Sequence, residues 1–275
     1  MTAVTAETAV SFEKPGLFKR LKSMLGVDFY RLFHTPAFYI FLVIAAVIPA
    51  LILGMANGAD GTGQLYTNTW QMIAADTPLY VVSDIAEYAN MNMVFIFGGI
   101  LLSIFIGHDF GSGYVKQLFT THPKKSDYMI SKTLTGAFSM ACMCVIYLIA
   151  TVFAGALSGT SFVVDAGSLI IALVGKILLS LGWSALYTFI NILFRRYFGI
   201  SIALCFFFGT GILIIGAAAL LGNSVVLNVF LYGASVYACL SSGISALAVS
   251  IVCSAAWAVV YNALGTLVLS RTDVY

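Results

Sequence analysis

Charged residues are scarce in this sequence. Asp, Glu, Lys and Arg together make up 9% of the 275 residues, whereas hydrophobic residues make up 61%. A soluble domain typically has about 25% charged residues, and its surface needs them for contact with water. So few charges on so apolar a chain exclude an ordinary soluble fold and indicate a protein whose surface contacts lipid.

Alternating apolar and polar segments of about ten residues, which mark the strands of a membrane barrel, are also lacking. In hydrocarbon every backbone polar group needs a partner within the protein, so the remaining choice is helices. The sequence therefore predicts an all-α integral membrane protein. Six runs reach the roughly 20 apolar residues that cross a bilayer core: 37–55, 91–107, 134–157, 169–194, 199–222 and 244–270.

Residues 1–15 lack the apolar core of a secretory signal, so we expect this N-terminus to be retained as a flexible tail. We expect residues 16–35 to form an interfacial elbow helix and residues 36–270 to form the six-helix part of a single transmembrane domain, 1–275. The five cysteines show neither a disulfide framework nor a metal-ligand spacing, because most lie inside apolar runs as small hydrophobic residues.

Lys and Arg are almost absent from one set of loops, and this asymmetry predicts the orientation. Cytoplasmic loops retain Lys and Arg, and with six spans twelve of the thirteen fall on one side of the membrane. The opposite loops contain acidic residues but no Lys or Arg. We therefore predict a multi-pass protein of the cell membrane with both termini in the cytoplasm. The twelve are Lys14, Lys19, Arg20, Lys22, Arg31, Lys116, Lys124, Lys125, Lys132, Arg195, Arg196 and Arg271.

Two features leave alternatives open. Residues 223–242 are apolar but short and interrupted, so they form either a seventh span or a re-entrant segment; we favour the re-entrant segment, because a seventh span would move Arg271 to the outer side. Lys176, in the outer part of the fourth span, either extends to the outer headgroups or lines a substrate path. We favour extension to the headgroups, because residues 177–194 alone are long enough to cross.

The N-terminal segment 16–33 has the spacing of an amphipathic helix lying on the inner membrane surface. Asp28 interrupts its apolar face, and Arg31 follows three residues later, which is within reach on a helix. We favour a local surface ion pair between these two residues, and a contact with another subunit is the alternative.

The segment between the second and third spans is the most informative part of the chain. Tyr114, Val115, Leu118 and Phe119 have near-helical spacing, Pro123 ends this element, and Ser126 is a potential cap for the next helix. A short helix with exposed aromatic residues at the inner face suits docking to a soluble partner. The alternative is an amphipathic connector that rests on lipid.

Motifs on both sides of this turn resemble the cytoplasmic signature of the ABC-2 type permeases, the membrane subunits of ABC exporters. The first is Gly107-x-Asp109-Phe110-x-x-Gly113-x-x-Lys116, and the second is Pro123-x-x-Ser126-x-x-x-x-Ser131-Lys132. The segment Asp28-Phe-Tyr-Arg31-Leu-Phe is similar to the elbow helix of small six-span members, including those that serve bacteriocin immunity and antimicrobial-peptide resistance. The family often has a glutamate where this chain has His108 and Asp109.

This resemblance implies a coupling helix around residues 109–119 that receives the motion of a separate ATPase, with a smaller contact at Arg195, Arg196 and Tyr197. It also implies a homo- or heterodimer of permeases, a path lined by spans one, two and five, and an outer re-entrant segment before span six. The residues expected to dock the ATPase are Asp109, Phe110, Gly113, Tyr114, Lys116, Arg195 and Arg196.

No phosphate-binding loop Gly-x-x-x-x-Gly-Lys-[Ser/Thr] is present, so ATP and magnesium are expected to bind the partner and no cofactor to bind this chain. None of the six spans has Asp, Glu or His in its interior, which disfavours a proton- or sodium-coupled carrier. We therefore expect not an enzyme but a permease that exports an amphipathic peptide, antibiotic or lipid and binds no nucleic acid. A secondary carrier or channel and an inert membrane anchor are the alternatives.

Overall fold

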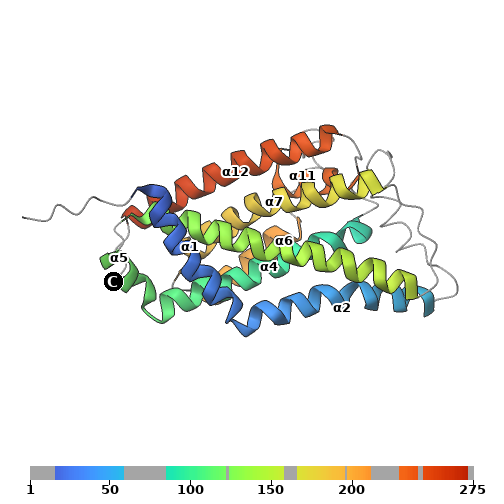
Figure 1. The fold of residues 1–275 in the computed structure, drawn as a ribbon, viewed down its shortest axis with the longest axis horizontal. Coiled ribbons are helices and arrows are strands. Elements are labelled where there is room, and N and C mark those ends of the chain that lie inside the picture. The colour runs from blue at the N-terminus through green and yellow to red at the C-terminus, as the bar shows by residue number, and fades with distance from the viewer. Residues whose placement is uncertain are drawn as a thin grey trace, which may run out of the picture.

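The computed structural model of the chain describes the helices of a bundle and some of their connections. The residues that it describes are 16–58, 85–121, 124–157, 166–195, 197–211, 229–240 and 244–271. All regular secondary structure within these ranges is α-helical (Figure 1). The helices are α1 (Leu17–Phe33), α2 (Pro36–Gly58), α4 (Ile85–Gly111), α5 (Tyr114–Thr121), α6 (Lys125–Leu157), α7 (Ala166–Leu193), α8 (Phe198–Gly209), α11 (Leu231–Leu240) and α12 (Ile244–Arg271).

Five of the six predicted spans coincide with long helices, namely α2, α4, α6, α7 and α12. Four helices contain segments long and apolar enough to cross a membrane, and α1 with the first part of α2 makes a further apolar pair bent by 66°. Of the predicted fifth span, α8 is described. Of the predicted re-entrant segment 223–242, residues 229–240 are described and include α11 (Leu231–Leu240), and whether the segment re-enters or spans stays a prediction. Six spans therefore stay a prediction.

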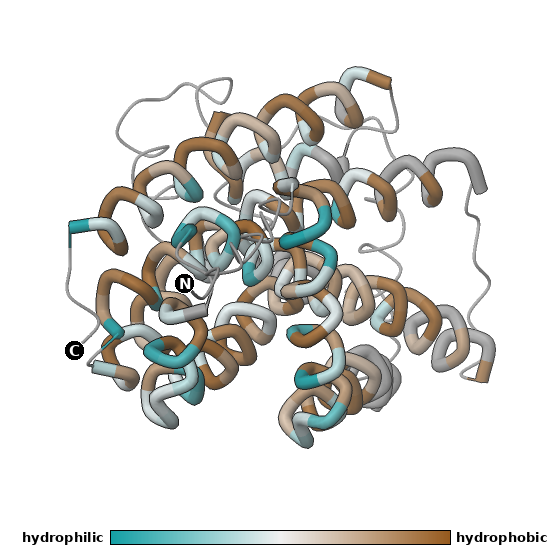
Figure 2. The backbone as a smooth tube through the Cα atoms, turned by 60° about the vertical axis from the view of Figure 1, so that its left-hand side comes forward, coloured by the Kyte–Doolittle hydropathy of each residue, from teal (hydrophilic) through white to brown (hydrophobic). Residues whose placement is uncertain are grey.

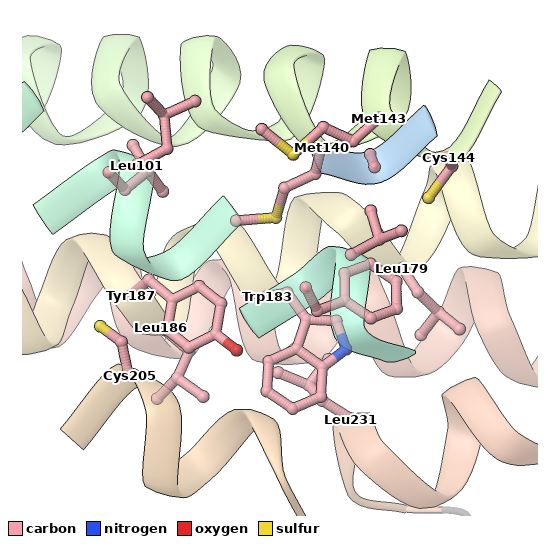
Figure 3. Packing of buried hydrophobic residues seen from close by; sticks show 14 of the residues in the cluster. Leu101, Met140, Met143, Cys144, Leu179, Trp183, Leu186, Tyr187, Cys205 and Leu231 are labelled. Atoms are coloured by element: carbon pink, nitrogen blue, oxygen red, sulfur yellow. The ribbon is translucent and has the colours of Figure 1, made fainter. Parts of the chain in front are cut away.

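The central helix of the bundle is α7, which packs against α12, α6, α4, α11 and α8. Its side chains Leu179, Trp183 and Tyr187 are almost completely buried. Close packing at this position depends on small residues, since a Cβ atom on Gly136 of α6 would overlap Ser184 of α7. The hydrophobic core therefore lies along α7 (Figure 3).

The outward side of α12 is apolar. Val252, Val259 and Leu267 are exposed on it, and apolar segments occur along each of the long helices (Figure 2). Exposed aliphatic side chains on a long helix are what lipid contact requires. The bundle thus has the surface of a membrane protein, as its composition predicts.

Helices α1 and α5 lie at the same end of the bundle (Figure 1). A small apolar cluster joins them to the ends of α6, α7 and α12, through Met24, Val115, Tyr128, Ile192 and Leu269. Lys125 at the start of α6 donates a hydrogen bond of 2.5 Å to the carbonyl oxygen of Leu269 near the end of α12. This end of the molecule is therefore fixed by packing and by a polar contact.

Candidate functional site

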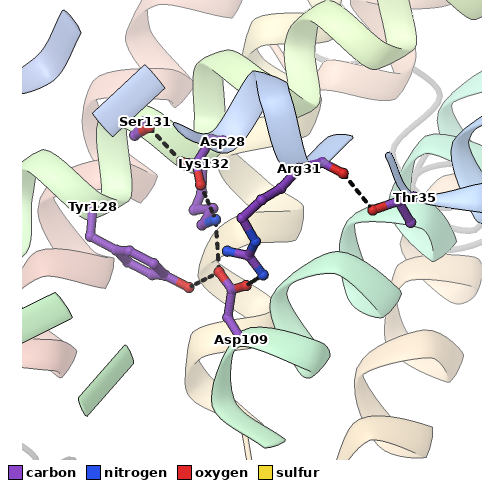
Figure 4. Close-up of polar contacts among 7 residues, drawn as sticks. All are labelled: Asp28, Arg31, Thr35, Asp109, Tyr128, Ser131 and Lys132. Carbon is purple, nitrogen blue, oxygen red and sulfur yellow. Dashed lines mark hydrogen bonds and ion pairs between the residues drawn. The ribbon is translucent and has the colours of Figure 1, made fainter. Parts of the chain in front are cut away.

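Four charged side chains meet where α1, α4 and α6 converge (Figure 4). Lys132 of α6 lies between two carboxylates: its Nζ is 2.6 Å from Asp28 Oδ1 and 2.7 Å from Asp109 Oδ2. The Arg31 guanidinium donates to Asp109 Oδ1. We call Asp28, Arg31, Asp109 and Lys132 the charge junction. Two acids and two bases give it a formal charge of zero.

Two hydroxyl groups complete the junction. Ser131 Oγ donates to Asp28 Oδ2 at 2.6 Å, and the Tyr128 hydroxyl donates to Asp109 Oδ2 at 3.2 Å. Each carboxylate oxygen therefore accepts at least one hydrogen bond. This matters because a buried ion is tolerated only when its remaining hydrogen-bonding capacity is satisfied, and the side chains of Asp28, Asp109 and Lys132 are at most 1% exposed.

Helical spacing explains how each element presents its part of the junction. On α1, Asp28 lies between Met24 and Leu32 at intervals of four residues, so all three occupy the face that packs into the bundle. On α6, Tyr128 precedes Ser131 by three residues and Lys132 by four, which places them on neighbouring turns. Asp109 is in the last turn of α4.

Aromatic rings surround the cations and extend the junction to α5. The Arg31 guanidinium lies 4.3 Å from the ring centroid of Tyr114, the first residue of α5, and Lys132 Nζ lies 4.3 Å from that of Phe105. Cation–π contacts of this kind are strongest when water is excluded. Burial lowers the pKa of Arg31, but Asp109, with smaller contributions from Tyr114 and Asp28, raises it overall, so Arg31 is a permanent cation.

A second ion pair holds the start of α1. Arg20 Nε lies 2.8 Å from Asp127 Oδ2, near the start of α6. Helix α1 is thus attached to α6 at two levels, about two helical turns apart. It is a fixed part of this end of the bundle.

The structure distributes the predicted docking residues between surface and interior. Lys116 of α5 is exposed, Phe110, Gly113 and Tyr114 are partly buried, and Asp109 is fully buried in the junction. Gly113 has φ +74° and turns the chain from α4 into α5. The exposed side of α5 consists of Lys116, Gln117 and Thr120.

The predicted second docking contact is only partly described. Arg195 is partly buried and Tyr197 is exposed just after α7, whereas Arg196 lies outside the described residues. Docking through either region stays a prediction. Because Asp109 is buried, however, its contribution to docking is restricted to positioning the α4–α5 turn.

The expected local pair between Asp28 and Arg31 is wrong. Asp28 bonds Lys132 and Ser131 of α6, and Arg31 bonds Asp109 of α4. The two residues do not face lipid or water as a surface pair, because this side of α1 packs on α6. The motif residues Ser131 and Lys132 were a signal for the contact, but helical spacing alone does not reveal partners on other helices.

The expected extension of Lys176 to the headgroups is also wrong. Its side chain is fully buried, and its Nζ lies 5.4 Å from the ring centroid of Phe95 on α4. Extension along the surface requires a helix at the edge of the bundle, whereas α7 is surrounded by neighbours. Hydropathy predicted the span that forms α7, but it did not predict that α7 lies in the centre of the bundle.

The residues around the charge junction give no support for metal binding or for acid–base catalysis. Across the described residues, no group of three or more His, Cys, Asp or Glu side chains is arranged to hold a metal ion. The carboxylates of the junction are engaged by cations and hydroxyls. The arrangement serves to hold helices together, with α5 exposed beside it.

Comparison with known families identifies the region that contains the junction. The family model described as "ABC-2 family transporter protein" matches residues 25–212. That range includes all four junction residues and the whole of α5. A search of curated proteins found no match.

Proposed function

The chain belongs to the ABC-2 transporter family and is thus the membrane subunit of an ABC transporter, and we propose that a separate ATPase drives it through α5 to export an amphipathic substrate. The observation that carries this proposal is the position of α5. It is a helix of eight residues with one exposed side, placed directly beside the charge junction.

The two sides of α5 suit a helix that receives force from a soluble partner. Val115 is buried against Tyr128 and Met129 of α6, so α5 is attached to the bundle. Lys116, Gln117 and Thr120 remain exposed for contact. A partner that moves α5 would therefore also move the helices on which it packs.

The charge junction gives that motion a route to three helices. Arg31 contacts Tyr114 of α5 and bonds Asp109 of α4, while Lys132 of α6 bonds both junction carboxylates. Buried ion pairs resist separation, because a partner left alone would remain as an unpaired buried charge. We infer that α1, α4 and α6 move together at this end.

The remaining parts of the proposal follow the charge distribution. The end with α1 and α5 faces the cytoplasm of a six-span protein in the cell membrane, with both termini on that side. Transport occurs between two permease copies, whose contact includes exposed apolar side chains of α2 and α8 such as Val43 and Phe206. The substrate is an antimicrobial peptide or a lipid-like molecule, since few charges line the predicted spans.

Charge reversal on the exposed side of α5 tests the docking. Lys116→Glu should reduce both co-purification of the ATPase and ATP-dependent export by at least about fivefold, because a favourable contact becomes repulsive at roughly 1 kcal/mol or more. Lys22→Glu is the matched control, since Lys22 is exposed on α1. Wild-type docking and export in Lys116→Glu, or export that persists without any ATPase, would contradict the proposal.

A further inference from the structure

A row of polar and aromatic side chains runs along one face of α7. It comprises Lys176, Ser180, Trp183, Tyr187 and Asn191, spaced three or four residues apart and all buried. This spacing places them on a single side of the helix. Figure 3 shows Trp183 and Tyr187 next to each other, with Cys205 of α8 close to Tyr187 and Leu231 of α11 close to Trp183.

Two hydrogen-bond donors in this row lack an acceptor among the described residues. Ser180 donates to the Ala137 carbonyl at 3.1 Å and Asn191 to the Tyr187 carbonyl at 2.8 Å. Within the described part of the chain, by contrast, neither Trp183 Nε1 nor the buried Tyr187 hydroxyl has a hydrogen-bond partner.

Buried tryptophan and tyrosine side chains usually find a hydrogen-bond partner. Trp257, elsewhere in the same bundle, donates its Nε1–H to the Val229 carbonyl at 2.7 Å. A buried donor without an acceptor lowers stability, and more so where no water can reach it. Two such donors on adjacent aromatic side chains, with no acceptor among the described residues, are available to an acceptor of another molecule.

The walls around these donors are flat and apolar. The Phe95 ring stacks on Trp183 with a centroid distance of 5.5 Å and an interplanar angle of 17°. Glycines bring α4 and α8 onto Tyr187: a Cβ atom on Gly209 would lie 2.9 Å from the hydroxyl oxygen, and one on Gly99 would lie 3.0 Å from the ring. These close approaches leave no room beside the Tyr187 hydroxyl, so a ligand can reach it only if α8 moves away from α7.

The end of α8 lies at the same place. The helix has 12 residues, fewer than a span requires, and is followed by Gly211 with φ +67°. Binding sites of membrane transporters are commonly built where a helix ends within the membrane. The end of α8 and the unpaired Tyr187 hydroxyl thus lie together.

We propose that Trp183 and Tyr187 form a binding site for the carbonyl oxygens of an amphipathic molecule, an amide or an ester, which enters when α8 separates from α7. The site rests on the proposed transport function and specifies its substrate chemistry. The two donors select acceptors, and the rings of Phe95, Trp183 and Tyr187 select an apolar body. A peptide and an acyl lipid both present this chemistry.

Site-specific photocrosslinking tests the site and separates the two sources. p-Benzoylphenylalanine replaces Trp183, or Leu231 as a second position, in the full chain co-expressed with its ATPase. Mass spectrometry of the adducts is expected to show an ester-lipid or a peptide in excess over the same label at Ile251, which is exposed on α12. Tyr187→Phe should lower this adduct about fivefold, the factor expected for one net hydrogen bond.

Two results would overturn the site. One is that the label at Trp183 or Leu231 crosslinks only within the protein, or only to the lipids that the label at Ile251 also captures. The other is a melting temperature of Tyr187→Phe that falls by about 2 °C or more, because removal of an unpaired hydroxyl should leave the melting temperature unchanged or raise it. Co-purification of the ATPase with Tyr187→Phe, expected at wild-type level, distinguishes failure of this site from failure of the transporter assignment.

Discussion

Asp28 and Lys132 are 104 positions apart in the sequence, yet Lys132 Nζ lies 2.6 Å from Asp28 Oδ1 with both side chains removed from solvent. The pair connects the first described helix of the chain to the helix that follows α5. Together with the Arg20–Asp127 pair, it attaches α1 to the bundle.

Breaking this pair from one side should be costly. Asp28→Asn leaves Lys132 with Asp109 as its one acidic partner, and Lys132→Met leaves two carboxylates with one cation. Removal of one partner from a buried ion pair typically costs about 3–5 kcal/mol, so we expect thermal unfolding of Lys132→Met well below wild type. The double variant Asp28→Asn/Lys132→Met, which restores neutrality, should unfold above Lys132→Met; equal or lower stability would contradict the pairing.

Arg31→Lys should separate charge from geometry. Lysine retains the positive charge but lacks the planar guanidinium that lies over Tyr114 while donating to Asp109. We expect a loss of about 1 kcal/mol in stability and a larger relative loss of transport than of ATPase co-purification. Measurement of both in the same membranes checks this. If Arg31→Lys transports like wild type, the contact with Tyr114 is not needed for coupling.

The turn between α4 and α5 offers a conformational test. Gly113 has φ +74°, and a Cβ atom added there would meet nothing within 4 Å, so Gly113→Ala adds backbone strain of about 1 kcal/mol without a steric clash. Gly111→Ala is the matched control, because Gly111 ends α4, has equal space around it and does not share the positive φ. We expect the melting temperature to fall only in Gly113→Ala. A fall of the same size in both would mean that the turn geometry is not responsible.

Close packing of α6 on α7 can be tested at Gly136. A Cβ atom there would overlap both Ser184 Oγ and a methyl group of Leu102. Overpacking of this kind costs about 1–3 kcal/mol, so Gly136→Ala should lower the unfolding temperature. Gly26→Ala on the exposed side of α1 should raise it slightly, since alanine favours a helix and nothing lies within 4 Å. Equal stability of the Gly136→Ala variant and wild type would contradict the packing.

The helices themselves followed from hydropathy, because a bilayer core imposes a length that apolar runs reveal directly. The five described long helices cover the predicted runs, apart from the last residue of the run 169–194. The ends agree within one residue for α12, whereas α6 begins nine residues before the run 134–157. The short helix α5 was also predictable, since its apolar residues have near-helical spacing and the segment lies between Gly113 and Pro123.

Partners of individual charges were not predictable in the same way. Asp28 was visible as an exception on an apolar face, but the choice between Arg31 and Lys132 depends on which helix packs against that face. Lys176 shows the same limit. The sequence reveals that a charge lies within a span, but whether its side chain reaches the headgroups depends on which helices surround it, and hydropathy does not predict that. Both outcomes are decided by tertiary packing rather than by local pattern.

The neutrality of the charge junction has an electrical consequence. Displacing one elementary charge through a membrane potential requires about 2.3 kcal/mol per 100 mV. Asp28, Arg31, Asp109 and Lys132 sum to zero, so the four residues can shift together toward or away from the bilayer without net work against the cell's voltage. The junction itself should therefore add no dependence on membrane voltage to the motion of this end of the molecule.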